Sequence, residues 1–152
     1  MSQNLDVQYA VGDGDAEPPS PAELSAWVEA ALAGRRTGAE LTIRIVGTAE
    51  IQALNRDYRH KDVPTNVLSF PFEAPPGVDV PLLGDVVICA DVVAAEAAQL
   101  EIASNVHWAH MVVHGVLHLL GYDHVEARDA QVMEGEEAHV LAGLGYPDPY
   151  IH

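Results

Sequence analysis

The chain has one cysteine among its 152 residues, and this scarcity limits two kinds of architecture. A disulfide framework needs cysteine pairs, so Cys89 cannot cross-link the fold. A closed structural zinc site usually takes cysteine among its four ligands, and such a site is therefore disfavoured. Cys89 lies in the apolar run 86–90. We predict a buried, unreactive thiol in a reducing compartment.

Basic residues are also few: 7 lysines and arginines stand against 23 aspartates and glutamates, a formal net charge of −16. Nucleic-acid binding proteins usually present a basic surface, so this composition counts against broad nonspecific binding. Basic side chains do gather within residues 56–61, and a bound metal ion would add positive charge there. We interpret the acidic residues near the C-terminus as a solvated helix face; they are Glu126, Asp129, Glu134, Glu136 and Glu137.

Long apolar runs are missing as well, so no segment is expected to span a membrane. The first residues also lack the basic flank and apolar stretch of a secretory signal. We therefore expect a cytoplasmic protein. With 152 residues, 49% of them hydrophobic, the chain has material for one domain over residues 1–152 and a substantial core.

Hydrophobic periodicity predicts a mixed order of strands and helices. The helices gather after the fourth strand, so we expect a single α+β domain in which a small mixed β-sheet of about four strands packs against about five helices. We predict strands at 5–11, 40–46, 66–72 and 84–90. We predict helices at 21–33, 48–58, 91–102 and 126–142, and one more helix in the histidine-rich segment that follows residue 102.

Three helix starts carry a capping signal. Ser20 followed by Pro21 and Glu23 is a capping box, in which the serine and glutamate side chains bond each other's backbone N–H groups. Thr48 and Asp91 each precede a helical pattern, and we predict that both are N-caps.

Three histidines and a glycine form the pattern H-x-x-x-H-x-x-G-x-x-H at His114, His118, Gly121 and His124. The i, i+4 spacing puts two imidazoles on one helix face, near enough to share one ion. Gly121 can end the helix in a left-handed conformation, and the returning chain would bring His124 over the same face. Three neutral nitrogens with a fourth position for water are typical of catalytic zinc. We predict one Zn²⁺, although the same ligands accept nickel, cobalt or copper.

Other polar residues near this motif have less specific signals. His107 and His110 lie on the same helical stripe, and we predict that they pack in the core or support the ligands. Asp123 can orient a histidine, act as a general base or stabilise a tight turn, and the sequence leaves these roles open. Asp85 follows Gly84 near a strand start, where a turn role is the common one.

One residue departs from the zinc protease signature H-E-x-x-H. That signature has a glutamate after its first histidine as general base, and this chain has Gly115 there. Proton transfer would then fall to metal-activated water or to a base elsewhere in the chain. Peptide hydrolysis is disfavoured, and an amide hydrolase with the same zinc geometry remains an alternative.

Residues 107–124 resemble the signature of the bacterial YbeY family, the ribosomal RNA maturation endoribonucleases. Residues 54–71, LNRDYRHKDVPTNVLSFP, resemble the other motif of that family, and residues 83–88, LGDVVI, resemble its strand before the long helices. The order and separation of these segments also match. The resemblance extends over residues 40–150.

The resemblance implies an α+β fold with a metal site in a cleft beside the sheet. It implies a metal-dependent, single-strand-specific endoribonuclease that acts in ribosomal RNA processing, 16S rRNA 3′-end maturation and ribosome quality control. His114, His118 and His124 would be the ligands, and Arg59 stands at a position linked to activity, where a guanidinium can bind phosphate through two N–H donors.

The implied partners are a ribosomal RNA precursor and proteins of the small ribosomal subunit, with no membrane and no DNA. A nonenzymatic ribosome assembly factor, whose metal holds the C-terminal helices together, is a further alternative. Water and the RNA 2′-hydroxyl both remain open as the nucleophile.

Overall fold

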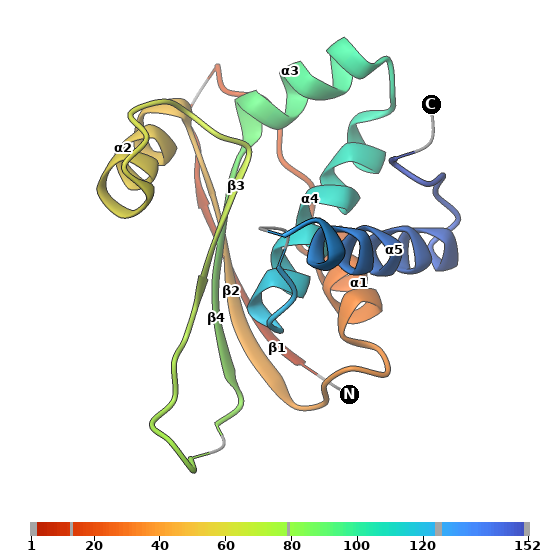
Figure 1. Cartoon of the computed structure of the whole chain (residues 1–152). Helices are drawn as coiled ribbons and strands as arrows, with labels where there is room; N and C mark the ends of the chain where they lie inside the picture. The colour runs from red at the N-terminus through yellow and green to blue at the C-terminus, as the bar shows by residue number, and fades with distance from the viewer. Residues whose placement is uncertain (1–2, 13, 79, 124–125, 151–152) are drawn as a thin grey trace.

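The computed structural model describes residues 3–12, 14–78, 80–123 and 126–150, and its centre is a four-stranded mixed sheet (Figure 1). The strand order is β1-β2-β4-β3; the first three run parallel, and β3 pairs antiparallel with β4 at one edge. Each strand lies within two residues of its predicted limits. The strands are β1 (Gln3–Ala10), β2 (Ala39–Val46), β3 (Val67–Pro71) and β4 (Leu82–Cys89).

Five helices accompany the sheet within the described residues, which confirms the predicted α+β fold. One face of the sheet, the inner face, is covered by α4, which contacts β3 and β4 and packs against α1 and α5. On the opposite, outer face, α2 is the one helix among the described elements (Figure 1). The helices are α1 (Pro21–Leu32), α2 (Thr48–Arg59), α3 (Ala90–Leu100), α4 (Ser104–Leu119) and α5 (Ala127–Gly143). None of the described helices is long and apolar enough to cross a membrane.

The capping box at the start of α1 is confirmed. The backbone N–H of Glu23 donates to Ser20 Oγ at 3.2 Å, and the backbone N–H of Ser20 donates to Glu23 Oε1 at 3.0 Å. Pro21 takes the first helical position, where no N–H donor is needed.

The other two predicted caps are wrong. Thr48 is the first helical residue of α2, and its N-cap is Gly47, which has no side chain to donate or accept. Asp91 lies in the first turn of α3, and its carboxylate accepts the backbone N–H of Ala16 at 2.8 Å. Asp91 therefore ties a distant loop to the helix, a long-range contact that local sequence does not indicate.

The helix α4 approaches the sheet closely at Gly115. A Cβ atom there would lie 2.6 Å from Val86 Cγ1 and 3.4 Å from Ser69 Oγ. The Ser69 hydroxyl donates to the Gly115 carbonyl at 3.1 Å. The absence of a side chain thus lets α4 rest on β3 and β4, and this contact sets the position of the histidines on either side of Gly115.

The core confirms the prediction for the cysteine. Cys89 is fully buried at the end of β4, and burial raises the pKa of its thiol. A buried thiol with a raised pKa is mostly protonated and therefore a poor nucleophile.

Candidate active site

His114 and His118 lie one turn apart on α4, and their ring centroids are 4.7 Å apart. The opposite side of this helix is anchored in the core by fully buried apolar residues. The helix ends at Leu119, and Gly121 follows with φ +105°, in the left-handed region as predicted. The third predicted ligand, His124, lies outside the described residues.

A cavity of about 700 Å³ opens beside these histidines, between α4, β3 and the segment that joins α2 to β3. Arg59, His114 and His118, three of the four site residues predicted from the sequence, line it together. Asp123 also lines it, so the structure brings this carboxylate to the predicted site. Asp85 is not part of the described wall. It lies within β4 rather than in a turn, on the outer face of the sheet.

Arg59 ends α2, where His60 adopts a left-handed conformation (φ 61°) that turns the chain toward β3. The Arg59 guanidinium donates from Nη2 to the Ser69 carbonyl at 2.9 Å, and its Cζ lies 5.8 Å from the centroid of the Phe70 ring. Arg59 is exposed, but these contacts fix its head group at the rim of the cavity. It is therefore not simply a solvated cation at a helix end.

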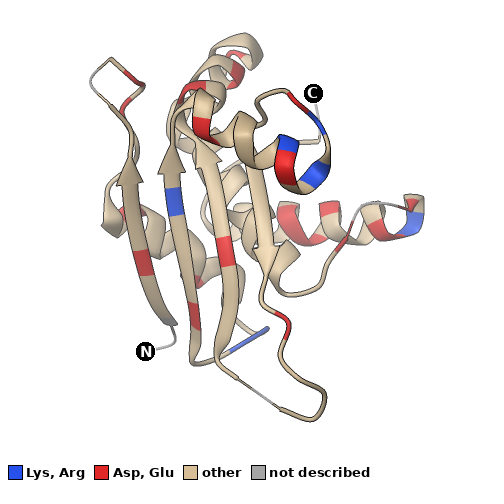
Figure 2. Ribbon diagram, turned by 90° about the vertical axis from the view of Figure 1, so that its left-hand side faces the viewer, with Lys and Arg blue, Asp and Glu red and all other residues tan. Residues whose placement is uncertain are grey.

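The charge around the cavity differs from that of the whole chain. Two cations, Arg59 and Lys61, and one carboxylate, Asp123, are the charged groups other than histidine that line it among the described residues. Figure 2 shows blue segments close together on α2 and the loop that follows, whereas red is spread over many elements. A net charge of −16 therefore does not prevent an anionic group from entering this cavity.

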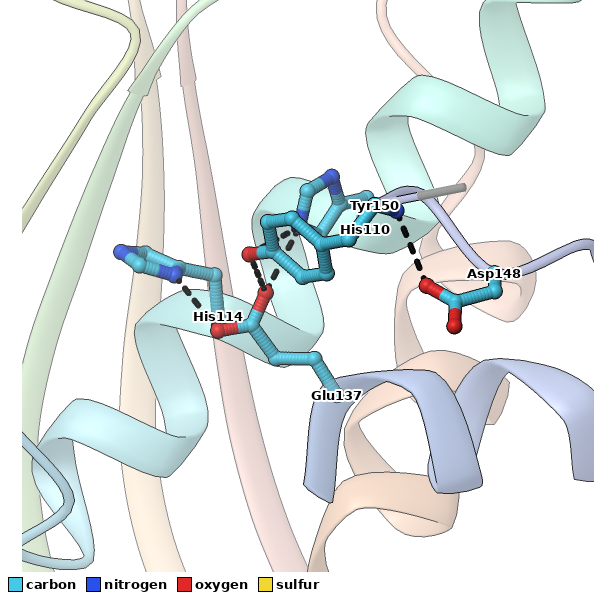
Figure 3. A network of polar contacts seen from close by, with 5 residues as sticks. All are labelled: His110, His114, Glu137, Asp148 and Tyr150. Atoms are coloured by element: carbon cyan, nitrogen blue, oxygen red, sulfur yellow. Dashed lines mark hydrogen bonds and ion pairs between the residues drawn. The ribbon is translucent and has the colours of Figure 1, made fainter. Parts of the chain in front are cut away.

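The prediction of a solvated acidic helix face near the C-terminus is wrong at Glu137, whose side chain is 1% exposed. It lies at the centre of a polar network (Figure 3). Glu137 Oε2 accepts from His114 Nδ1 at 3.0 Å, and Oε1 accepts the Tyr150 hydroxyl at 2.6 Å. Oε1 also lies 2.6 Å from His110 Nε2. The carboxylate is buried because it falls on the stripe of α5 that packs against α4.

These contacts determine the protonation of the network. Burial alone would raise the pKa of Glu137, but hydrogen bonds from His110, His114 and Tyr150 outweigh burial and lower the pKa to about 2. Burial and the Glu137 carboxylate raise the pKa of Tyr150, so its hydroxyl stays protonated and donates. Glu137 is thus an ionised acceptor at neutral pH.

An ionised acceptor at Nδ1 of His114 favours the tautomer that carries its proton there and its lone pair on Nε2. A neutral imidazole with this lone pair is the form that binds zinc. The two imidazoles on α4 and the buried carboxylate behind one of them therefore fit a divalent metal ion. No group of three His, Cys, Asp or Glu side chains arranged to hold a metal occurs within residues 3–12, 14–78, 80–123 and 126–150. The complete ligand set, with His124, stays a prediction.

The sequence profile described as Endoribonuclease YbeY matches residues 15–145. The chain belongs to the YbeY family. The match contains all three segments that resemble the family, residues 54–71, 83–88 and 107–124. The fold is also similar to the solution structure of TM1509 from Thermotoga maritima, with 22% sequence identity, a TM-score of 0.58, and coverage of 97% of this chain and 99% of that chain. At 22% sequence identity, this similarity is evidence for a shared fold alone.

In this member of the YbeY family, a second network supports the wall of the cavity. His107, 5% exposed, lies with Nε2 2.8 Å from Glu96 Oε1. The same carboxylate oxygen accepts from Asn66 Nδ2 at 3.1 Å, and Asn66 lines the cavity. His107 and His110 thus bond carboxylates without lining the described cavity, in agreement with their predicted packing or supporting roles. Sequence reasoning did not find Asn66, Glu96 or Tyr150, because their partners lie far away in the chain.

Proposed function

We propose that this chain is a metal-dependent, single-strand-specific endoribonuclease that acts in ribosomal RNA processing, including 16S rRNA 3′-end maturation and ribosome quality control. Membership of the YbeY family supports RNA hydrolysis. The observation that carries the proposal is the cavity that Arg59 shares with His114 and His118. The substrate in this proposal is a ribosomal RNA precursor, and the compartment is the cytoplasm.

Four lining residues of the cavity have a role in this proposal: Arg59, His114, His118 and Asp123. His114 and His118, with His124, would hold one Zn²⁺, and Glu137 would orient His114. Bound zinc lowers the pKa of a coordinated water to about 7 and polarises a phosphoryl oxygen. Arg59 has further N–H donors beyond the one used by Ser69, and these bind the phosphate. Asp123 is the one carboxylate in the described wall, and it is our candidate to accept a proton.

The amide hydrolase alternative loses support from the packing of Gly115. A side chain at this position would start 2.6 Å from Val86 Cγ1 and point into the sheet. A glutamate there would first have to displace the buried Val86 side chain. The packing of α4 on β4 therefore disfavours the general base of the zinc protease signature at this position, in addition to its being missing from the sequence.

Cleavage of a purified ribosomal RNA precursor tests the proposal. We expect zinc-loaded protein to cut the single-stranded RNA, and we expect no cleavage after zinc is removed with a chelator. The His118→Ala variant, purified identically and shown to be folded by circular dichroism, is also expected to be inactive. A duplex of the same sequence should resist cleavage. Equal cleavage by the parent and the variant would indicate a contaminating nuclease, and no cleavage by either would favour a nonenzymatic role in ribosome assembly.

We expect Arg59→Ala to lower kcat/KM for RNA cleavage by about tenfold, the effect of losing one hydrogen bond to a charged group. Arg59→Lys should recover part of this loss, because it keeps the charge but not the planar donors. Arg56→Ala is the matched control: Arg56 lies on the same helix and pairs with Asp57 at 3.0 Å. Its effect should stay within about twofold. Equal losses for the two alanine variants would show that Arg59 acts only through net charge.

A further inference from the structure

A second hollow, of about 430 Å³, lies on the outer face of the sheet beside α2. Its floor includes two aromatic rings, Tyr58 of α2 and Phe70 of β3. The ring centroids are 5.3 Å apart, with an angle of 73° between the planes. Tyr58 is 61% exposed, so this aromatic surface faces solvent. The other lining residues are Gln8, Thr42, Arg44, Glu50, Leu54, Asp85 and Val87.

The hollow and the active-site cavity meet at the edge strand β3. Successive side chains of a strand point to opposite faces. Ser69 points to α4 on the inner face, where its hydroxyl bonds the Gly115 carbonyl, and Phe70 lies on the outer face. Arg59 lines the cavity, bonds the Ser69 carbonyl, and has its Cζ 5.8 Å from the Phe70 centroid. One guanidinium therefore connects the two sites around the sheet edge.

The distance between these groups suits a nucleotide. The Arg59 Cζ lies over the Phe70 ring, 5.8 Å from its centroid. A phosphate bound at Arg59 is therefore close enough for a base of the same or the adjacent nucleotide to reach the aromatic pair.

The charges of the hollow favour a base over a phosphate. Arg44 is already paired with Glu50 at 2.6 Å, and Asp85 adds a further negative charge. Asp85 is the direct cross-strand partner of Phe70, so its carboxylate stands next to the ring on the same face. An anionic group is repelled here, whereas a neutral ring with N–H donors is matched by the aromatic surface and the carboxylate acceptor.

We propose that Phe70 and Tyr58 form a subsite that stacks one unpaired base of the RNA strand whose phosphate is bound at Arg59, with Asp85 accepting an N–H of that base. This inference rests on the proposed function, because it assumes that RNA enters the cavity of His114 and His118. It gives the preference for single strands a structural basis, since a base held in a duplex cannot be splayed out onto the rings.

The test compares intact single-stranded RNA with a series in which one base at a time is removed to leave an abasic site. Binding is measured by fluorescence anisotropy in the His118→Ala background, so that the RNA is not cut. We expect Phe70→Leu and Tyr58→Leu to weaken binding of intact RNA by about fivefold to a hundredfold. With both rings present, RNA that is abasic at one particular position should show the same loss of affinity. On that abasic RNA, Phe70→Leu should cause no further loss.

Controls separate stacking from general effects. Tyr9 of β1 is 43% exposed and, among the described residues, lines neither cavity, so Tyr9→Leu should leave binding unchanged. Because the Tyr58 side chain is mostly exposed, its replacement should leave the fold intact, and a loss of binding by Tyr58→Leu is then not explained by misfolding. Asp85→Ala removes both acceptor oxygens and should weaken binding of intact RNA but not of RNA that is abasic at the stacking position, and an unchanged affinity for intact RNA would remove Asp85 from the proposal.

The outcomes distinguish this subsite from the proposed nuclease activity. Cleavage by the zinc-loaded parent, together with equal affinity of the ring variants for intact and abasic RNA, would overturn the subsite and leave the nuclease intact. Base-dependent binding through Phe70 without any cleavage would support the subsite and contradict the nuclease. Equal losses by Phe70→Leu on intact and on every abasic RNA would also overturn the subsite.

Discussion

Replacing Gly115 with alanine is expected to lower the free energy of unfolding by about 1–3 kcal/mol, the usual effect of overpacking a dense core. The direction of this change in the free energy of unfolding is informative, because replacing glycine with alanine inside a helix normally stabilises the protein by about 1 kcal/mol. At this position the new Cβ would lie 2.6 Å from Val86 Cγ1 and 3.2 Å from Val86 Cγ2. Val86 is fully buried in β4, so α4 must move away from the sheet and weaken the bond between Ser69 and Gly115.

Gly135 provides the matched control for this substitution. It lies inside α5, and nothing is within 4 Å of the position its Cβ would take. We expect Gly135→Ala to raise the free energy of unfolding by up to about 1 kcal/mol. Urea unfolding of both variants, followed by circular dichroism on zinc-free protein, measures the difference. Similar stabilities for the two variants would mean that α4 does not press on the sheet as closely as the structure shows.

A glutamate at position 115 should have a larger effect. Its side chain would start 2.6 Å from the buried Val86 and be forced between α4 and β4, and burial of an unpaired charge costs several kcal/mol. We expect Gly115→Glu to yield no soluble folded protein. Full recovery of a folded Gly115→Glu chain would reopen the amide hydrolase alternative.

Local patterns were sufficient to predict most of the fold. The capping box at Ser20 and the alternating strand residues depend on neighbours within a few positions, and so they are encoded in short segments. The spacing of His114 and His118 is also local, because one helical turn brings them together whatever surrounds the helix. These features were predicted correctly because tertiary contacts only had to preserve them.

The missed residues depend on contacts between distant segments. Glu137 has the charge of a solvated residue, yet it follows the buried Met133 by four positions and precedes the buried Leu141 by four. That spacing is the signal that could have identified it. Its partners on α4 and in the C-terminal segment could not be deduced from the sequence. Asp91 was misjudged for the same reason, since its carboxylate bonds Ala16 across the fold.

Substituting glutamine for Glu137 is expected to weaken zinc binding by about tenfold to a hundredfold, the usual effect of removing a group that orients a metal-binding histidine. Donors from His110, His114 and Tyr150 converge on the two carboxylate oxygens. Glutamine has only one acceptor oxygen, and its amide N–H₂ would meet a second donor. His114 then loses either its orientation or the tautomer with its lone pair on Nε2. Competition with a chromogenic chelator measures the zinc affinity directly.

Glu136→Gln is the matched control, because it removes the same charge from the neighbouring residue. Glu136 pairs with Arg35 at 2.6 Å and accepts the Tyr122 hydroxyl at 3.2 Å, so its partners are not the histidines of α4. We expect the Glu136→Gln variant to bind zinc as tightly as the parent protein. An equal decrease in both variants would mean that long-range charge accounts for the effect, since each variant loses one negative charge. A decrease confined to Glu137→Gln would assign it to the hydrogen bond at His114 Nδ1, and hence would support His114 as a metal ligand independently of any cleavage assay.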